Sequence, residues 1–232
     1  MKTFSLIYVF VLLISNISLA SVIKSSKTGN WTNSNTWKNN ATPSIHDTVF
    51  VSIGDTIFIN SSFLKCALLN NSGVVFFKSA TNYLEADNVI LKSGIVTGNS
   101  LGTIVTESVF SEGKSEIGKC NLKVLDSLIN IDTLIFTSSS GYKFFNKLIN
   151  EGTISNIANE DLNIASILAN RGQFNFFSGK IFFTSFGEIY GNILIKKLSI
   201  TDSLTSYDTL LIQEKIEGNG HIRNEGILKL GM

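Results

Sequence analysis

Proline, histidine, cysteine and charged residues are scarce in this chain, and each shortage excludes a class of protein. In 232 residues there are one Pro, two His and two Cys, and charged residues make up 16% of the total. His and Cys this sparse form no metal-binding spacing, and the Gly-Gly-x-Gly-x-Asp phrase of calcium-binding β-rolls does not occur. The formal net charge is +1, and the sequence has neither a basic stripe that would favour nucleic acid nor a Lys/Arg cluster that would favour anionic lipid. We therefore expect no metal, no cofactor and no nucleic-acid partner.

Carboxylates that could act as a catalytic pair are also few. Enzymes that cleave polysaccharides place two carboxylates, or a carboxylate and a basic group, on one face of the site. Glu85 and Asp87 would point the same way on a strand, and Lys92 follows them. No nucleophile-elbow phrase is present. We assign no catalytic residue, and the alternative to a non-enzymatic protein is a polysaccharide lyase or glycosidase, or a fragment of one, whose groove gathers these three side chains.

Long hydrophobic runs are absent except for one at the start of the chain. Lys2 supplies a positive charge, residues 4–14 (FSLIYVFVLLI) are almost wholly apolar, and Ser18-Leu19-Ala20 ends the segment with small residues at the two cleavage-determining positions. This pattern predicts a secretory signal peptide over residues 1–20 and is too short for a membrane span. We therefore expect a secreted or cell-surface protein with no transmembrane segment in its mature chain.

The two cysteines, Cys66 and Cys120, leave two alternatives open. An exported chain lies in a compartment where a disulfide between them is chemically possible. Free cysteine also behaves as a small buried hydrophobe, and that alternative has equal weight.

Short runs of β-branched, Leu and Phe residues, closed by Asn, Asp, Gly or Ser, are what the chain has in abundance. Examples are DTVFVSI, GVVFF, GTIVT, DTLIF and DTLLI. Strands of about five residues punctuated this often indicate an all-β protein. Asn-x-Gly before a strand recurs, as at Asn150-Gly152. Here Asn is expected to bond its own backbone or adopt a left-handed turn, and Gly to adopt positive φ.

Longer recurrences predict a solenoid. The phrase DSLINIDTLIF at Asp126 returns as DSLTSYDTLLI at Asp202, and INEGTI returns 74 residues later as RNEGIL. Asn150 and Asn170 are one short step of 20 residues apart. Steps near twenty, nested in a unit of about 75, indicate three or four coils per unit. We predict a right-handed parallel β-helix over residues 47–232, with Asn side chains stacked along its axis, and keep an antiparallel β-sandwich as the alternative.

The segment GNWTNSNTWKNNATPSIHDTVFVSIGDTIFIN, residues 29–60, differs from the rest of the chain. Its order GNW…TW…P…D.V.I..GD.I resembles the G8-like N-terminal segment of secreted and cell-surface β-helical repeat proteins of Bacteroidota. The strand-rich repeats that follow are similar to those of the same proteins. The resemblance implies an exported β-helix that begins with a specialised segment.

The two tryptophans of this segment have a structural interpretation and a functional one. The first coil of a solenoid has no neighbour below it, so its apolar interior needs a cap. We interpret residues 21–46 as that cap and Trp31 and Trp37 as its plug. The alternative is an aromatic platform on which a glycan stacks. At the other end the sequence stops directly after an expected strand, which predicts an unsealed last coil that continues in a longer chain or stacks end to end on a partner.

Taken together, these features favour an exported, non-enzymatic structural or adhesion protein. Its extended β-solenoid surface would present repeated side chains to an extracellular glycan or another cell-surface component. A repeat fold provides such a surface, although the step from solenoid to adhesion is an analogy from fold.

Overall fold

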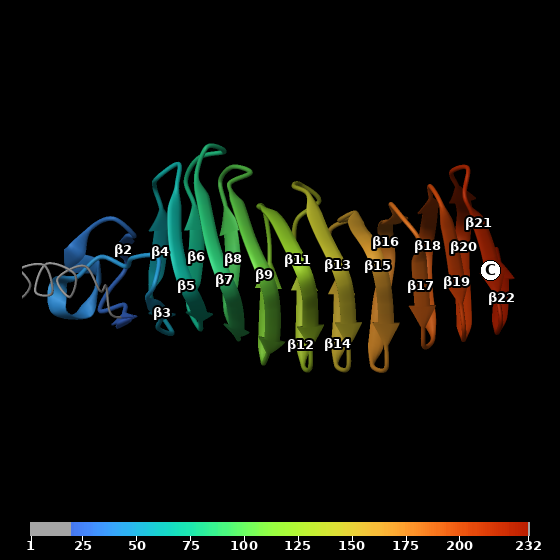
Figure 1. Ribbon diagram of the computed structural model, residues 1–232, viewed down its shortest axis with the longest axis horizontal. Coiled ribbons are helices and arrows are strands. Elements are labelled where there is room, and N and C mark those ends of the chain that lie inside the picture. Colours follow the sequence, from blue (N-terminus) through green and yellow to red (C-terminus); the bar gives the residue numbers. More distant parts are fainter. Residues whose placement is uncertain (1–19, 232) are drawn as a thin grey trace, which may run out of the picture.

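The computed structural model describes residues 20–231 and is an elongated parallel β-helix (Figure 1). Strands contain 63% of the described residues and helices 3%, and the coils that they form number about nine. The predicted all-β class and the parallel β-helix are therefore confirmed. The predicted signal peptide lies outside the described residues except for Ala20.

The first half of the rod contains eleven strands and two short 3-10 helices: β1 (Val22–Lys24), β2 (Gly29–Asn30), η1 (Ser34–Thr36), η2 (Lys38–Asn40), β3 (Thr48–Val51), β4 (Thr56–Ile59), β5 (Leu64–Asn71), β6 (Val74–Phe77), β7 (Tyr83–Lys92), β8 (Ile95–Gly98), β9 (Thr103–Glu112), β10 (Lys114–Ile117) and β11 (Asn121–Asn130). The second half contains β12 (Thr133–Phe136), β13 (Lys143–Asn150), β14 (Thr153–Asn156), β15 (Leu162–Asn170), β16 (Gln173–Phe183), β17 (Gly187–Tyr190), β18 (Ile193–Ile200), β19 (Ser203–Ser206), β20 (Thr209–Glu217), β21 (His221–Asn224) and β22 (Ile227–Leu230).

Every pairing between these strands is parallel, and nearly every strand pairs with the strand two places further along the chain. The isolated bridge between Ser25 and Trp37 is the antiparallel exception, and it lies outside the strands. An antiparallel sandwich would pair neighbouring strands through hairpins, so the alternative fold is wrong.

The pairings define three sheets that wrap around one core. Sheet 1 begins with β1 and β3 and continues through the second halves of the odd-numbered strands from β5 to β15. It ends with β17, β19 and β21. Sheet 2 contains β2, β4, β6, β8, β10, β12 and β14, the first parts of β16, β18 and β20, and β22. Sheet 3 contains the first halves of the odd-numbered strands from β5 to β15, and the last parts of β16, β18 and β20.

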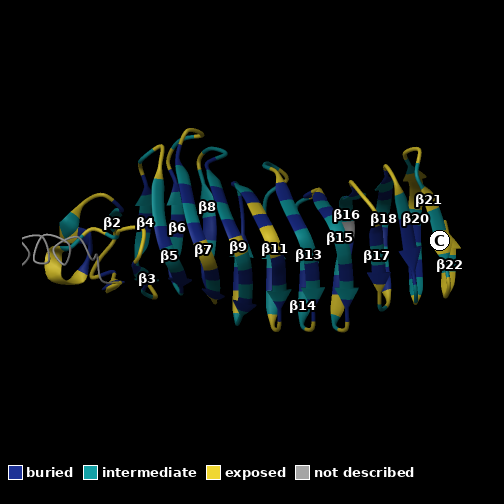
Figure 2. Ribbon diagram, in the orientation of Figure 1, coloured by how far each residue is buried: buried dark blue, intermediate teal, exposed yellow. Residues whose placement is uncertain are grey.

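Alternation along each strand places one side chain in the core and the next on the surface. Buried and less buried residues therefore alternate in bands along the rod (Figure 2). Leu128, Leu148 and Leu168 show the consequence, since they occupy one position in three successive coils and none of them is exposed to solvent. Stacking like residues on like in this way fills the core without any helix.

The recurrence of 76 residues spans four coils. Ile135 of β12 pairs with Ser155, and the same stack passes through β16 and β18 to Leu211 of β20. The phrases DTLIF and DTLLI therefore occupy the same place in sheet 2. The sequence predicted three or four coils per unit, and the structure has four.

The Asn-x-Gly turns join sheet 1 to sheet 2, but their backbone differs from the prediction. Neither Asn150 nor Gly152 has positive φ. A Cβ at Gly152 would instead collide with the backbone carbonyl of Asp132, and one at Gly172 with that of Gly152. Glycine is required here because the backbones of neighbouring coils approach closely at this corner, and the expected left-handed turn is wrong.

The N-terminal segment is part of the solenoid as well as its end. β1 and β2 pair with β3 and β4, so the first coil begins before the boundary predicted at residue 47. The loop between β2 and β3 carries η1, η2 and the two tryptophans at the N-terminal end of the rod (Figure 1). In the last coil Leu230, which pairs with the buried Ile212, is 59% exposed. The unsealed end and the self-stacking both stay predictions.

Candidate functional site

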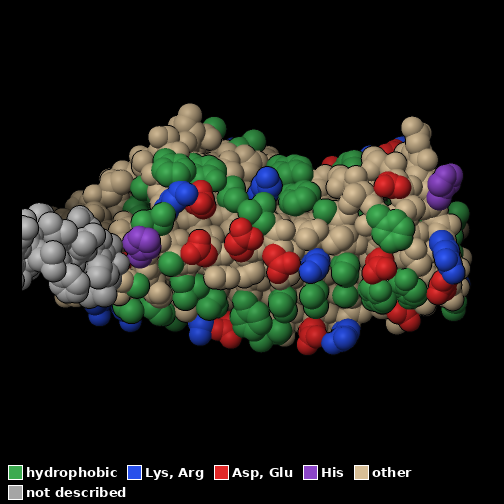
Figure 3. Space-filling model, in the orientation of Figure 1, with side chains coloured by type: hydrophobic (Ala, Val, Ile, Leu, Met, Phe, Trp, Pro, Cys, Tyr) green, Lys and Arg blue, Asp and Glu red, His purple; other side chains and the backbone are tan. Residues whose placement is uncertain are grey.

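An apolar ladder runs along the outer surface of sheet 1. Register places these side chains one above another in successive coils, all pointing away from the core: Ile90, Phe110, Ile129, Ile149, Ala169 and Tyr190. On the face of the rod seen in Figure 3, hydrophobic side chains gather in rows between charged ones. Apolar side chains in a regular outward row are available to a ligand or partner, because they do not pack inside the core.

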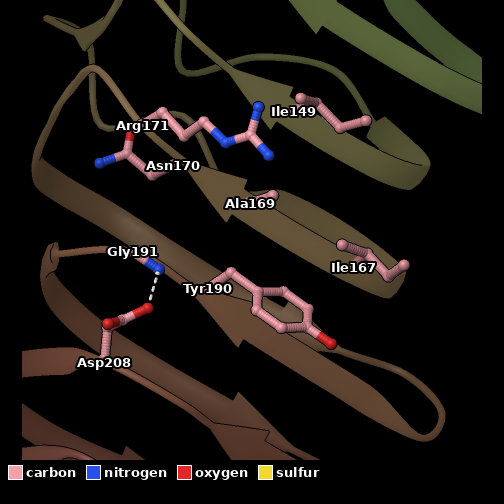
Figure 4. A pocket seen from close by; sticks show the side chains of 8 residues that line it. All are labelled: Ile149, Ile167, Ala169, Asn170, Arg171, Tyr190, Gly191 and Asp208. Atoms are coloured by element: carbon pink, nitrogen blue, oxygen red, sulfur yellow. Dashed lines mark hydrogen bonds between the residues drawn. The ribbon is translucent and has the colours of Figure 1, made fainter.

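Ala169 interrupts this ladder with a side chain much smaller than its neighbours. Ile149 precedes it and Tyr190 follows it in the stack. The missing volume leaves a groove of about 470 Å³, whose lining Figure 4 draws as sticks: Ile149, Ile167, Ala169, Asn170, Arg171, Tyr190, Gly191 and Asp208. Ile149, Ala169 and Tyr190 therefore form a step-shaped hollow one coil wide, with an apolar floor.

Tyr190 lines one wall of the groove, and Tyr207 stacks behind it. The rings of Tyr190 and Tyr207 lie 4.7 Å apart between centroids and 8° from parallel, so Tyr207 covers one face of Tyr190. Tyr190 is still 37% exposed. Its hydroxyl donates to Glu188 Oε2 at 2.9 Å, and this bond is the main reason that the pKa of Tyr190 is raised to about 12. The ring is thus fixed at its edge and on one face.

Charged and polar groups form the rim of the groove. Arg171 Nη1 lies 3.0 Å from Glu151 Oε1, and the Arg171 side chain is 81% exposed. Asp208 Oδ2 accepts from the backbone amide of Gly191 at 2.8 Å, the dashed contact of Figure 4. Asp208 and Arg171 are the charged residues that line the groove, and Glu151 and Glu188 lie beside it, each bonded to a lining residue. An apolar floor with a few fixed polar groups around it is typical of a small-ligand site.

The carboxylates singled out from the sequence do not form a catalytic site. Glu85 Oε1 is 2.7 Å from Lys65 Nζ, and Lys92 Nζ is 2.8 Å from Glu112 Oε1, so both are held in ion pairs between adjacent coils. Glu85 and Asp87 line one small hollow, whereas Lys92 lines a different one. The groove that was to gather all three is therefore not formed.

The two tryptophans lie inside the N-terminal end of the core. Trp31 and Trp37 are each 1% exposed, and their rings meet edge to face with centroids 5.3 Å apart. Trp37 Nε1 donates to the Trp31 carbonyl at 2.8 Å. A glycan platform needs an open ring face, and neither ring has one. The geometry therefore favours the cap.

The two cysteines are free and buried. Cys66 stacks over Ala86 and Thr106, and Val124 lies three coils above it, in the coil that contains Cys120. Three coil steps amount to about 14 Å, since parallel strands lie about 4.8 Å apart. A disulfide needs Cα atoms within about 7 Å. Of the two alternatives, the structure has the separate buried thiols, and burial raises the pKa of Cys66 to about 12 and that of Cys120 to about 11.

A buried ion pair is the feature that sequence analysis missed most completely. Lys143 begins β13 at an inward position between Leu122 and Leu162, and neither Lys143 nor Glu160 has more than 1% of its side chain exposed. Lys143 Nζ lies 3.2 Å from Glu160 Oε2 and donates to the Cys120 carbonyl at 2.6 Å. Asn156 fixes the loop that carries Glu160, accepting from its backbone amide and donating to its carbonyl. The pair is enclosed on all sides and is therefore part of the core.

Residues 20–231 contain no cluster of His, Cys, Asp and Glu able to hold a metal ion. In the same part of the chain no helix has the length and apolar character needed to cross a membrane. Comparison of the sequence with protein-family models and with curated proteins, and of the fold with solved structures, gave no match. The resemblance of the N-terminal segment therefore stays an expectation.

Proposed function

We propose that this protein is an exported, non-enzymatic adhesion protein that binds extracellular glycan through the outer surface of its β-helix. The observation that carries the proposal is the outward apolar ladder of sheet 1, interrupted at Ala169 by a groove with a tyrosine wall. Exposed aromatic rings beside polar groups are the side chains on which sugars stack. The predicted signal peptide supports export.

The arrangement of charges supports binding without turnover. Many acidic side chains are paired with a basic one, commonly in an adjacent coil, as Glu85 is with Lys65 and Glu151 with Arg171. A general acid for glycoside cleavage needs a raised pKa and a second carboxylate facing it across the substrate. Glu160 has a raised pKa, caused mainly by burial, but it is enclosed in the core. These observations favour the non-enzymatic alternative over the lyase or glycosidase.

Retention on polysaccharides tests the proposal. The purified mature chain would be passed over a panel of insoluble neutral and acidic polysaccharides, and the bound fraction and the release of reducing ends or unsaturated products would be measured together. We expect retention on at least one polysaccharide and no product. Product release would favour the enzyme instead, and no retention on any member of the panel would contradict adhesion to glycan.

A further inference from the structure

We propose that the Ala169 groove is a subsite for one neutral sugar residue, which stacks on the free face of Tyr190. This inference rests on the proposed glycan binding and specifies its site and its ligand class. No feature of the sequence analysis pointed to it.

The size of the gap is the first argument. Because parallel strands lie about 4.8 Å apart, Ile149 and Tyr190 are separated along the axis by two steps, or roughly 10 Å. Ala169 fills only the base of the interval between them. A pyranose ring is about as thick as one such step, so it fits between the two larger side chains with one face against a ring.

The orientation of Tyr190 is the second argument. Tyr207 covers one face of its ring, and the hydrogen bond to Glu188 holds its hydroxyl edge. Ala169 precedes Tyr190 in the stack and Tyr207 covers its far side, so the opposite face is directed toward the groove. Figure 4 shows Tyr190 beside Ala169 and Ile167. A ring fixed in this way loses little conformational freedom when a ligand stacks on it, and preorganisation of this kind favours affinity.

Charge selects the class of sugar. Asp208 lines the groove, and Glu151 and Glu188 are bonded to its lining residues Arg171 and Tyr190, so carboxylates in and beside the groove outnumber the single guanidinium of Arg171. An excess of acceptors suits hydroxyl groups, which donate to carboxylates. The same excess repels a uronate or a sulfated sugar. The groove therefore matches a neutral hexose within a longer glycan chain.

Calorimetric titration of the mature chain with cellohexaose, maltohexaose and a galacturonate hexamer tests the inference. We expect a neutral hexamer to bind and the acidic one to bind at least about tenfold more weakly. Ala169→Ile fills the gap and Tyr190→Ala removes the wall, and each is expected to weaken binding about tenfold or more. Tyr190→Phe keeps the ring and is expected to retain most of the affinity.

Two control variants keep the result specific. Ala80→Ile adds the same carbon atoms on an exposed loop, and Tyr142→Ala removes a tyrosine that is 47% exposed and stacked on Phe144 elsewhere. Both are expected to bind like the unchanged chain.

If the unchanged chain binds and Ala169→Ile and Tyr190→Ala bind equally well, the subsite is wrong and glycan adhesion stands. Preference for the acidic hexamer overturns the subsite as well. If the unchanged chain binds neither these hexamers nor any polysaccharide of the panel, the subsite and the adhesion function both fall.

Discussion

Asn150 donates its side-chain amide to the side-chain oxygen of Asn170 in the next coil, with Nδ2 and Oδ1 2.7 Å apart. Asn130 makes the same bond to Asn150 at the same distance. Asn150 Nδ2 also lies 3.2 Å from the Gly152 carbonyl, so each Asn supports its own turn and the neighbouring coil. These three buried residues form the Asn ladder, which fixes the corner between sheets 1 and 2.

Interrupting the Asn ladder is expected to destabilise the rod. Asn150→Ala leaves Asn170 Oδ1 and the Asn130 amide without a side-chain partner inside the core. A buried polar group without a partner costs about 1–3 kcal/mol. Chemical denaturation should show a loss of that size, whereas the exposed Asn35→Ala serves as a control and should change stability by less than about 0.5 kcal/mol. Equal stability of the two variants would contradict the structural role of the ladder.

Extending the ladder by one coil is expected to stabilise the rod. Ser111 lies directly below Asn130, and both Ser111 Oγ and Asn130 Oδ1 are buried without a hydrogen-bond partner. Gly113 already completes an Asn-x-Gly phrase if residue 111 becomes Asn. Ser111→Asn should therefore donate to Asn130 and raise the free energy of unfolding by about 1 kcal/mol. A lower denaturation midpoint would show that the corner has no room for the amide.

The buried ion pair predicts a large single-variant effect that a second substitution reverses. Lys143→Met leaves Glu160 charged in the core, and breaking such a pair costs about 3–5 kcal/mol. Lys143→Met combined with Glu160→Leu removes both charges and should recover most of this loss. Urea denaturation of the two single variants and the double variant measures the coupling. Additive losses would contradict the account of the pair.

The same pair predicts a pH dependence with a definite sign. Burial raises the pKa of Glu160 above its ordinary value of 4.5, so the folded state holds that proton more tightly than the unfolded state does. Stability from this group is present below the ordinary value and decreases as pH rises from there through the folded pKa. The stability of the unchanged chain relative to Glu160→Gln should therefore fall as pH increases above 4.5. A rise over that window would contradict the prediction.

The tryptophan cap predicts loss of stability with no loss of binding. Trp37→Ala removes a fully buried ring and should lower the free energy of unfolding by about 3–5 kcal/mol. Glycan retention per folded molecule should not change, because neither ring is open to solvent. Thermal unfolding together with polysaccharide retention separates the two roles. Unchanged stability with lost binding would restore the platform interpretation.

Much of the fold could be predicted because each coil repeats the same local chemistry. The step from Asn150 to Asn170 set the coil length, and DTLIF and DTLLI marked equivalent places four coils apart. Coil lengths vary, however, and the register shifts between Val124 and Ser127, so the sequence alone does not say which side chains face one another. The enzyme alternative required Glu85, Asp87 and Lys92 to gather, but β7 passes from sheet 3 into sheet 1 between Ala86 and Asn88, which separates Lys92 from the other two.

The groove and the ion pair were missed for the same reason. Ala169 stands where Ile149 stands one coil earlier, and the phrases LIN and LAN before each turn carried that signal. An alanine in a strand is unremarkable until its neighbours in the stack are known to be isoleucine and tyrosine. Lys143 likewise looks like a solvated lysine in YKFF, because only the register places it over Leu122.

The most direct test of the account is a crystal structure of the mature chain soaked with the neutral hexamer that binds most tightly. We predict a sugar ring between Ile149 and Tyr190, stacked on the Tyr190 face that Tyr207 leaves open, with its hydroxyls directed at Asp208. A sugar bound only in the hollow beside Glu85 and Asp87, or a groove that stays free of sugar while the hexamer is bound elsewhere, would contradict it.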